Sequence, residues 1–144
     1  MTVPGDVICQ GVEEILEKMY FCEAECLGLG RIDALAIASQ VTFSGDLSGR
    51  FVTGATEGLA ARLAADFVAA DIADVTASQA TEIIHEFTNV ACAAALAEWL
   101  PHAKLNFSLP SSVSETEVPE QWSFRFGIDG AEPELAVSLI LASG

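Results

Sequence analysis

The chain is poor in basic side chains. Six lysines and arginines stand against 21 aspartates and glutamates, which gives a formal net charge of -15 over 144 residues. A surface this acidic repels nucleic-acid phosphates and anionic lipid headgroups, so both kinds of binding are disfavoured. The charge suits a protein partner that presents lysines around its docking face, although it does not identify one.

Long hydrophobic runs are also missing. The most apolar stretch, residues 90–100, is too short for a membrane span and contains Glu98. The first ten residues lack the basic start and the apolar run of a secretory signal. We therefore expect a cytoplasmic protein that does not associate with membranes.

Cysteine and histidine are too scarce and too scattered to predict a metal site. Cys22 and Cys26 lie four residues apart in a stretch expected to be helical, a spacing that could share a metal. No second ligand pair follows at zinc spacing, and His85 and His102 are distant in sequence. We expect all four cysteines to be reduced and to be ordinary small core residues.

Common catalytic signatures are absent as well. Gly45 and Gly49 lie in a predicted hairpin turn, and no lysine follows them at the spacing of a phosphate-binding loop. The sequence has no Gly-x-Ser-x-Gly elbow and no His-Glu-x-x-His helix. Polar side chains on an otherwise apolar helix are then the main indication of chemistry.

Composition and periodicity predict one folded domain over residues 1–144. Hydrophobic residues make up 51% and charged residues 19% of the chain, and no Pro/Gly/Ser-rich linker divides it. Apolar residues at helical spacing predict a first helix over 10–24, ended by Gly28 and Gly30. Strand-like runs over 34–43 and 50–53 predict a hairpin.

The second half of the chain has two marked helix starts. Thr56 is expected to cap a second helix, and residues 76–79 have the form of a capping box for a third helix over 78–100, ended by Pro101. Strands are predicted over 104–109, 121–128 and 135–141. This order predicts an α+β fold, with long helices packed on one face of an antiparallel sheet.

The predicted third helix carries the candidate site. Glu82, Glu86 and Asn89 are separated by four and then three residues, so they project from one face in consecutive turns. A carboxylate and a carboxamide on a helix are held in fixed relative positions, as a site that orients its reactants requires.

The segment Glu86-Phe87-Thr88-Asn89 resembles the Glu-x-x-Asn signature of the CheX/CheC/FliY chemotaxis phosphatases. The likeness extends over about residues 11–141. It includes the surrounding site helix (82–90), the Leu109-Pro110 pair after a strand, and the first hairpin with Phe43-Ser44-Gly45 and Gly49.

Two departures from the family pattern affect what the resemblance implies. Ala93 stands where members often have glycine, four residues after the asparagine. The first helix lacks a second Glu-x-x-Asn motif, because Glu13 is followed by Leu16 and Glu14 by Glu17. The resemblance therefore implies a protein with one site, closer to CheX than to CheC.

The resemblance implies a phosphatase that hydrolyses the aspartyl phosphate of a CheY-like response regulator. Asn89 would orient the attacking water, Glu86 would pair with a lysine of the regulator, and Glu82 would be a rim contact. The protein would need no metal or cofactor of its own, because Mg²⁺ is carried by the regulator. CheX-type proteins are homodimers that exchange a sheet segment, so a homodimer is also implied.

Two other functions stay open at this point. A non-catalytic CheX-like module could bind a receiver domain or pair with itself, with Glu86 and Asn89 as ordinary helix-surface residues. A sensory domain would need a cavity lined by convergent polar groups, and the sequence reveals none.

Overall fold

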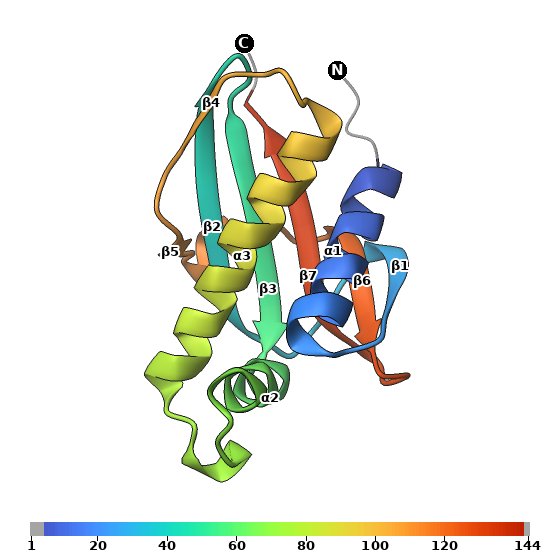
Figure 1. The fold of residues 1–144 in the computed structure, drawn as a ribbon, viewed down its shortest axis with the longest axis vertical. Helices are drawn as coiled ribbons and strands as arrows, with labels where there is room; N and C mark the ends of the chain where they lie inside the picture. The colour runs from blue at the N-terminus through green and yellow to red at the C-terminus, as the bar shows by residue number, and fades with distance from the viewer. Residues whose placement is uncertain (1–4, 143–144) are drawn as a thin grey trace.

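The computed structural model describes residues 5–142, in which one helix precedes a run of three strands and two further α-helices precede the remaining strands (Figure 1). The helices are α1 (Gly5–Tyr20), α2 (Glu57–Val68) and α3 (Ala77–Trp99), with short 3₁₀ helices η1 (Ile72–Asp74) and η2 (Glu115–Glu117). The strands are β1 (Ala24–Gly30), β2 (Leu35–Gly45), β3 (Gly49–Thr56), β4 (Leu105–Phe107), β5 (Ser111–Ser112), β6 (Trp122–Ile128) and β7 (Pro133–Leu141).

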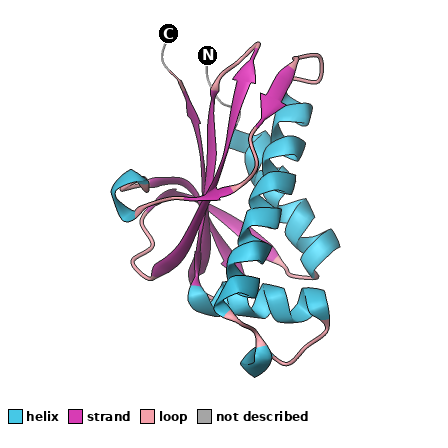
Figure 2. Cartoon of the chain, turned by 90° about the vertical axis from the view of Figure 1, so that its left-hand side faces the viewer, coloured by secondary structure: helices cyan, strands magenta, loops and turns pink. Residues whose placement is uncertain are grey.

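All pairings in the sheet are antiparallel, in the order β1-β6-β7-β3-β2-β4, with β5 also paired to β2. The three α-helices lie on one face of this sheet (Figure 2). The predicted α+β fold with helices on one face is therefore confirmed. A smaller cluster on the opposite face contains Trp122, Val52 and Ala136, with Val113 and Val118 packed against it.

The main core lies between the sheet and the helices. Helix α1 buries Ile8, Val12, Leu16 and Tyr20, which recur at helical spacing on one side. Strand β3 is central in the sheet, and five successive residues from Phe51 onward are buried. Helix α3 packs on strands β2 and β3 of this sheet.

Both predicted helix caps are present. The Thr56 hydroxyl accepts a hydrogen bond from the Leu59 backbone N–H at 3.2 Å, and α2 begins at the next residue. In α3 the Thr76 hydroxyl accepts from the Gln79 N–H at 3.1 Å, while the Gln79 side chain accepts from the Thr76 N–H at 2.9 Å. This reciprocal pair satisfies two of the backbone donors that a helix start leaves free.

The sequence predicts a first helix over residues 10–24, and the end of this prediction is wrong. The helix ends at Tyr20, the chain turns at Phe21 with a positive φ of 56°, and residues 24–30 form the edge strand β1. The two glycines taken to end a helix, Gly28 and Gly30, lie within this strand. Backbone pairing with β6, distant in sequence, stabilises the extended conformation.

The expected state of the cysteines is also partly wrong. Cys9 on α1 and Cys26 on β1 form a disulfide, with their Cα atoms 5.8 Å apart, so this pair is not reduced. Cys22 lies between helix and strand, and it does not share a helix face with Cys26. Cys22 and Cys92 are free and buried, as expected of small core residues.

Candidate functional site

The rotation of α3 about its axis is fixed by a buried hydroxyl pair. Thr88 on α3 and Thr53 on β3 are both fully buried, and their hydroxyls are hydrogen-bonded to one another. The Thr88 hydroxyl donates to the Ile84 carbonyl at 2.6 Å, which leaves its oxygen to accept from Thr53. The residue after Thr88 consequently points away from the sheet.

The three predicted site residues lie on the outward side of α3. Glu82, Glu86 and Asn89 are all exposed, as their spacing predicted. Within residues 5–142, the side chains of Glu86 and Asn89 form no hydrogen bond or ion pair, so both have free hydrogen-bonding capacity. The helix brings the three together, and a partner can reach them.

Helical spacing predicts that Ile83, Phe87, Val90 and Ala94 pack on the sheet, and this prediction is partly wrong. Ile83 and Phe87 are buried as expected, but Val90 is only half-buried and Ala94 is exposed. Ala94 borders a groove between α3 and α1 instead of packing on the sheet. The buried positions follow Thr88 through Ala91, Cys92, Ala95 and Leu96, one residue away from the predicted stripe.

His85 connects the site helix to the sheet. Its Nδ1 lies 2.6 Å from the Ser39 hydroxyl on β2, and its Nε2 lies 3.5 Å from the Ser112 hydroxyl on β5. Burial lowers the pKa of His85, and the negative charge of Glu82 acts in the opposite direction. A neutral imidazole can bond both hydroxyls, so His85 links α3 to strands β2 and β5.

A buried phenol lies behind the exposed carboxylate of the site. Tyr20 packs edge-on against Phe87, with ring centroids 6.1 Å apart. Its hydroxyl is buried and has no hydrogen-bond partner within the described chain. Burial, together with the negative charge of Glu86, raises the pKa of Tyr20 to about 12. Tyr20 is therefore protonated at neutral pH, and its hydroxyl can both donate and accept a hydrogen bond.

A groove opens beside Glu86, between α2 and α3. Its volume is about 270 Å³, and its lining is mostly apolar. Helix α2 contributes Ala64, Phe67 and Val68, and α3 contributes Gln79, Glu82, Ile83 and Glu86. The groove is continuous with the candidate site because Glu82 and Glu86 belong to both.

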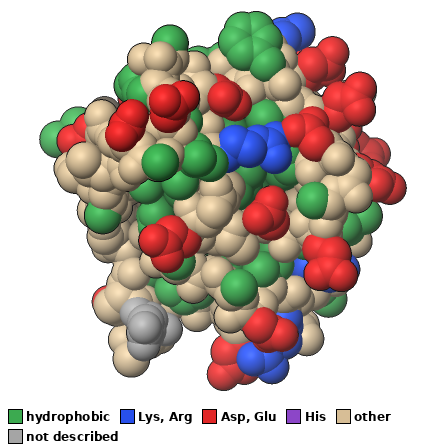
Figure 3. Space-filling model, turned by 90° about the horizontal axis from the view of Figure 1, so that it is seen from below, with side chains coloured by type: hydrophobic (Ala, Val, Ile, Leu, Met, Phe, Trp, Pro, Cys, Tyr) green, Lys and Arg blue, Asp and Glu red, His purple; other side chains and the backbone are tan. Residues whose placement is uncertain are grey.

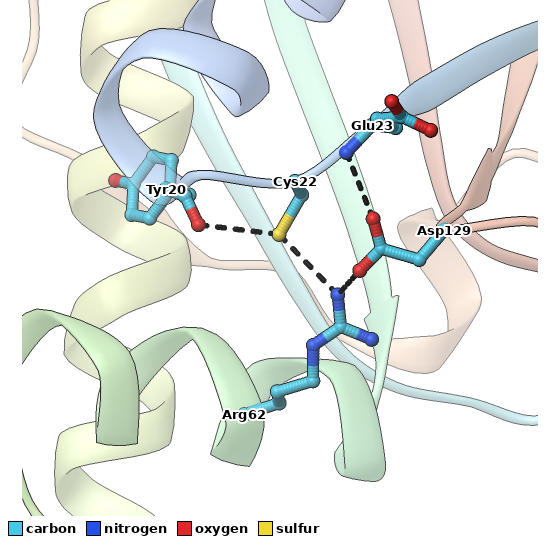
Figure 4. Close-up of polar contacts among 5 residues, drawn as sticks. All are labelled: Tyr20, Cys22, Glu23, Arg62 and Asp129. Atoms are coloured by element: carbon cyan, nitrogen blue, oxygen red, sulfur yellow. Dashed lines mark hydrogen bonds and ion pairs between the residues drawn. The ribbon is translucent and has the colours of Figure 1, made fainter.

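A second polar cluster lies apart from the site, at the turn between β6 and β7 (Figure 4). Arg62 of α2 forms an ion pair with Asp129, whose carboxylate also accepts from the Glu23 N–H at 2.9 Å. The Cys22 sulfur lies 3.4 Å from the Arg62 guanidinium. Burial nevertheless raises the pKa of the Cys22 thiol, which keeps it protonated and unreactive. This cluster links α2 to the sheet and serves stability.

Neither a metal-ligand cluster nor a membrane-spanning helix is present among the described residues. Between residues 5 and 142, no group of three or more histidine, cysteine or acidic side chains is placed to hold a metal ion. No helix in that range combines the length and hydrophobicity needed to cross a bilayer.

Comparison with known families decides the family of the chain. The sequence model of the chemotaxis phosphatase CheX family matches residues 37–123, more than half of the chain, and this range includes the groove and the three exposed residues of α3. The chain belongs to the CheX family of chemotaxis phosphatases. No curated protein sequence matches it.

Solved structures share the fold at low sequence identity. CheX of Borrelia burgdorferi, in a structure described as a CheX-CheY-BeF3-Mg+2 complex, has a TM-score of 0.77 and 11% identity, covering 99% of this chain and 100% of that one. CheX of Vibrio vulnificus has a TM-score of 0.75 and 14% identity, covering 96% and 95%. A putative chemotaxis protein of Desulfovibrio vulgaris Hildenborough has a TM-score of 0.71 and 14% identity, covering 98% and 100%. These likenesses establish a CheX-like fold.

Several residues that shape the site of this CheX family member act through contacts between distant segments of the chain. Sequence alone assigns no role to His85, to the Thr53–Thr88 pair or to Tyr20, because their contacts join elements distant in sequence. The threonines left a usable signal, since each is a hydroxyl residue at a position that the apolar pattern buries. The groove also has a signal in the sequence, because Phe67 is an aromatic residue near the end of an amphipathic helix.

Proposed function

We propose that this protein hydrolyses the aspartyl phosphate of a CheY-like response regulator, with Asn89 and Glu86 as its site. The observation that carries the proposal is their position. Both project from consecutive turns of a helix that the Thr53–Thr88 hydroxyl pair bonds to the sheet, and neither side chain is bonded to another residue of the range 5–142. Membership of the CheX family supports a phosphatase, and the CheY present in the Borrelia burgdorferi complex supports such a partner.

Hydrolysis needs a water molecule in line with the bond from phosphorus to the aspartyl oxygen. The new bond forms between water oxygen and phosphorus, and the aspartate leaves as a carboxylate. Mg²⁺ and a lysine of the regulator stabilise the charge on the phosphoryl oxygens, so this protein needs no cofactor of its own. Asn89 would accept a hydrogen bond from the water and hold it in line.

Glu86 is proposed to dock the regulator by pairing with its lysine, and Glu82 to be a rim contact. A carboxylate on a helix surface is a weak base toward water, so orientation of the water falls to Asn89 and docking to Glu86. The excess of acidic residues would also speed association with a basic docking face. We further propose that the protein is cytoplasmic and forms a homodimer, as its resemblance to CheX implies.

The alternative is a CheX-like module that binds or dimerises without turnover. Both functions would use the same exposed face of α3, so binding alone does not separate them. The test is a decay assay with a panel of phosphorylated receiver domains from the same genome. We expect at least one receiver to lose its phosphoryl group faster with the wild-type protein than with Asn89→Ala. Tight binding of a receiver with no acceleration would establish the binding module instead.

A further inference from the structure

The α2/α3 groove, lined by the residues given above, exposes hydrophobic side chains to solvent. Phe67 is 60% exposed and Val68 is 48% exposed, and both lie in the last turn of α2. Ile72, just beyond the helix, is 53% exposed. Seen from the α2 end, exposed hydrophobic side chains lie among acidic ones (Figure 3). Clustered apolar exposure beside a groove is typical of a protein interaction surface.

The rim of the groove carries charge of one sign. Glu82 and Glu86 are exposed carboxylates, Gln79 is neutral, and the groove is lined by no lysine or arginine of the part of the chain that the structure describes. An apolar floor below two carboxylates fits an apolar side chain that has a lysine or arginine beside it. Glu86 also belongs to the proposed catalytic face. A side chain bound in the groove would therefore lie next to the proposed site.

We propose that the α2/α3 groove is a specificity pocket for the receiver domain, which places an apolar side chain against Phe67 and a neighbouring basic side chain against Glu82. This inference rests on the proposed function for its partner. It adds that receivers are selected through α2, a helix that carries none of the residues assigned to the reaction. Truncation of a buried aromatic contact at an interface centre commonly weakens binding by tenfold or more, so Phe67 is the expected main contact.

Two other occupants fit the groove less well. A second copy of this chain would bring its own acidic rim to a symmetric interface, and like charges would face one another. A small molecule needs convergent polar groups for orientation, and the floor of the groove, formed by Ala64, Phe67, Val68 and Ile83, provides none.

The experiment measures binding and turnover separately. Affinity is measured by titration with a receiver held in its active form by beryllofluoride and Mg²⁺, and KM and kcat are measured with the phosphorylated receiver. Phe67→Ala is compared with Phe107→Ala, the same change at an exposed site on β4, outside the groove. Glu82→Lys is compared with Glu98→Lys, the same charge reversal on an exposed part of α3.

We expect Phe67→Ala to raise Kd and KM about tenfold, and Glu82→Lys to raise both more at low salt than at high salt. The matched controls should stay within about twofold of wild type. If Phe67→Ala has the Kd and KM of the wild type, the specificity-pocket proposal is wrong and the phosphatase proposal is unaffected. If the wild type binds a receiver through the groove but does not hydrolyse its phosphoryl group, the phosphatase proposal is wrong and the specificity-pocket proposal stands. A dimer that dissociates on Phe67→Ala would assign the groove to self-association, and no binding of any receiver would overturn both proposals.

Discussion

The hydroxyl of Thr88 on α3, the residue before the exposed Asn89, is hydrogen-bonded to the hydroxyl of Thr53 on β3. The two residues are 35 positions apart in sequence, and both are fully buried. This contact connects the middle of the site helix to a central strand of the sheet and, together with the buried apolar side of α3, sets which residues of the helix face a partner.

Thr88→Val should destabilise the fold by about 1–3 kcal/mol, because it leaves the buried Thr53 hydroxyl without its partner. The double variant Thr53→Val/Thr88→Val should be less destabilised than the sum of the two single variants. Urea unfolding of all four proteins measures this coupling. Simple additivity of the two losses would show that the hydroxyl pair contributes no coupling.

Asn89→Ala should reduce kcat by ~10² or more, since it removes the group that orients the water. Glu86→Ala should instead raise KM and reduce the dependence of KM on salt, because its expected partner is a lysine of the regulator. Steady-state kinetics with a phosphorylated receiver separate the two effects. Full activity of Asn89→Ala on a confirmed substrate would rule out the proposed mechanism.

Glu13→Gln and Glu14→Gln should leave turnover intact apart from a modest loss of electrostatic steering, because α1 carries no second carboxamide at the required spacing. The Glu13 carboxylate accepts a hydrogen bond from the Cys26 N–H at 3.2 Å, which a glutamine can also accept. Titration with a beryllofluoride-activated receiver should reach saturation at one receiver per protomer. Two receivers per protomer would contradict the single-site proposal.

The only tyrosine of the chain should titrate abnormally. Burial and the Glu86 charge raise the pKa of Tyr20 to about 12, so its ultraviolet titration in the folded protein should lie well above the ordinary value of about 10. The protonated form is favoured by the fold. Its stabilising contribution is therefore complete below about pH 10 and is lost as pH rises toward 12. A midpoint near pH 10 in protein that is still folded would contradict this.

Tyr20→Phe should keep or raise stability, by up to about 1 kcal/mol, because it removes a buried hydroxyl that has no hydrogen-bond partner among the described residues. It should also lessen the fall in stability between pH 10 and pH 12. Urea midpoints at neutral and alkaline pH provide both readouts. A clear loss of stability at neutral pH would mean that the hydroxyl is bonded in solution.

Protein purified without reductant should have two free thiols after denaturation, from Cys22 and Cys92, and four after reduction. The disulfide closes a short loop, since its cysteines are 17 residues apart, and its reduction should lower the free energy of unfolding by about 3 kcal/mol. Thiol titration in denaturant and urea unfolding with and without reductant measure these effects. Four free thiols before reduction would show that Cys9 and Cys26 are not joined by a disulfide.

The parts of the site that sequence alone predicted are those set by local rules. A capping box at Thr76 and Gln79 fixed the start of α3, and helical spacing then placed Glu86 and Asn89 on one face. Such rules involve residues within one or two turns of each other, which can be read directly from a single chain. The exposure of both residues follows from the same periodicity.

Only the tertiary structure decided what surrounds that helix. Residues 24–30 became a strand because β6 supplies hydrogen bonds from a distant part of the chain, and this strand brings Cys26 to Cys9. The Thr53–Thr88 pair and the groove beside Phe67 likewise join elements that are separate in sequence. Helical periodicity specifies which residues share a face, but long-range packing specifies which way that face turns and what lies beside it.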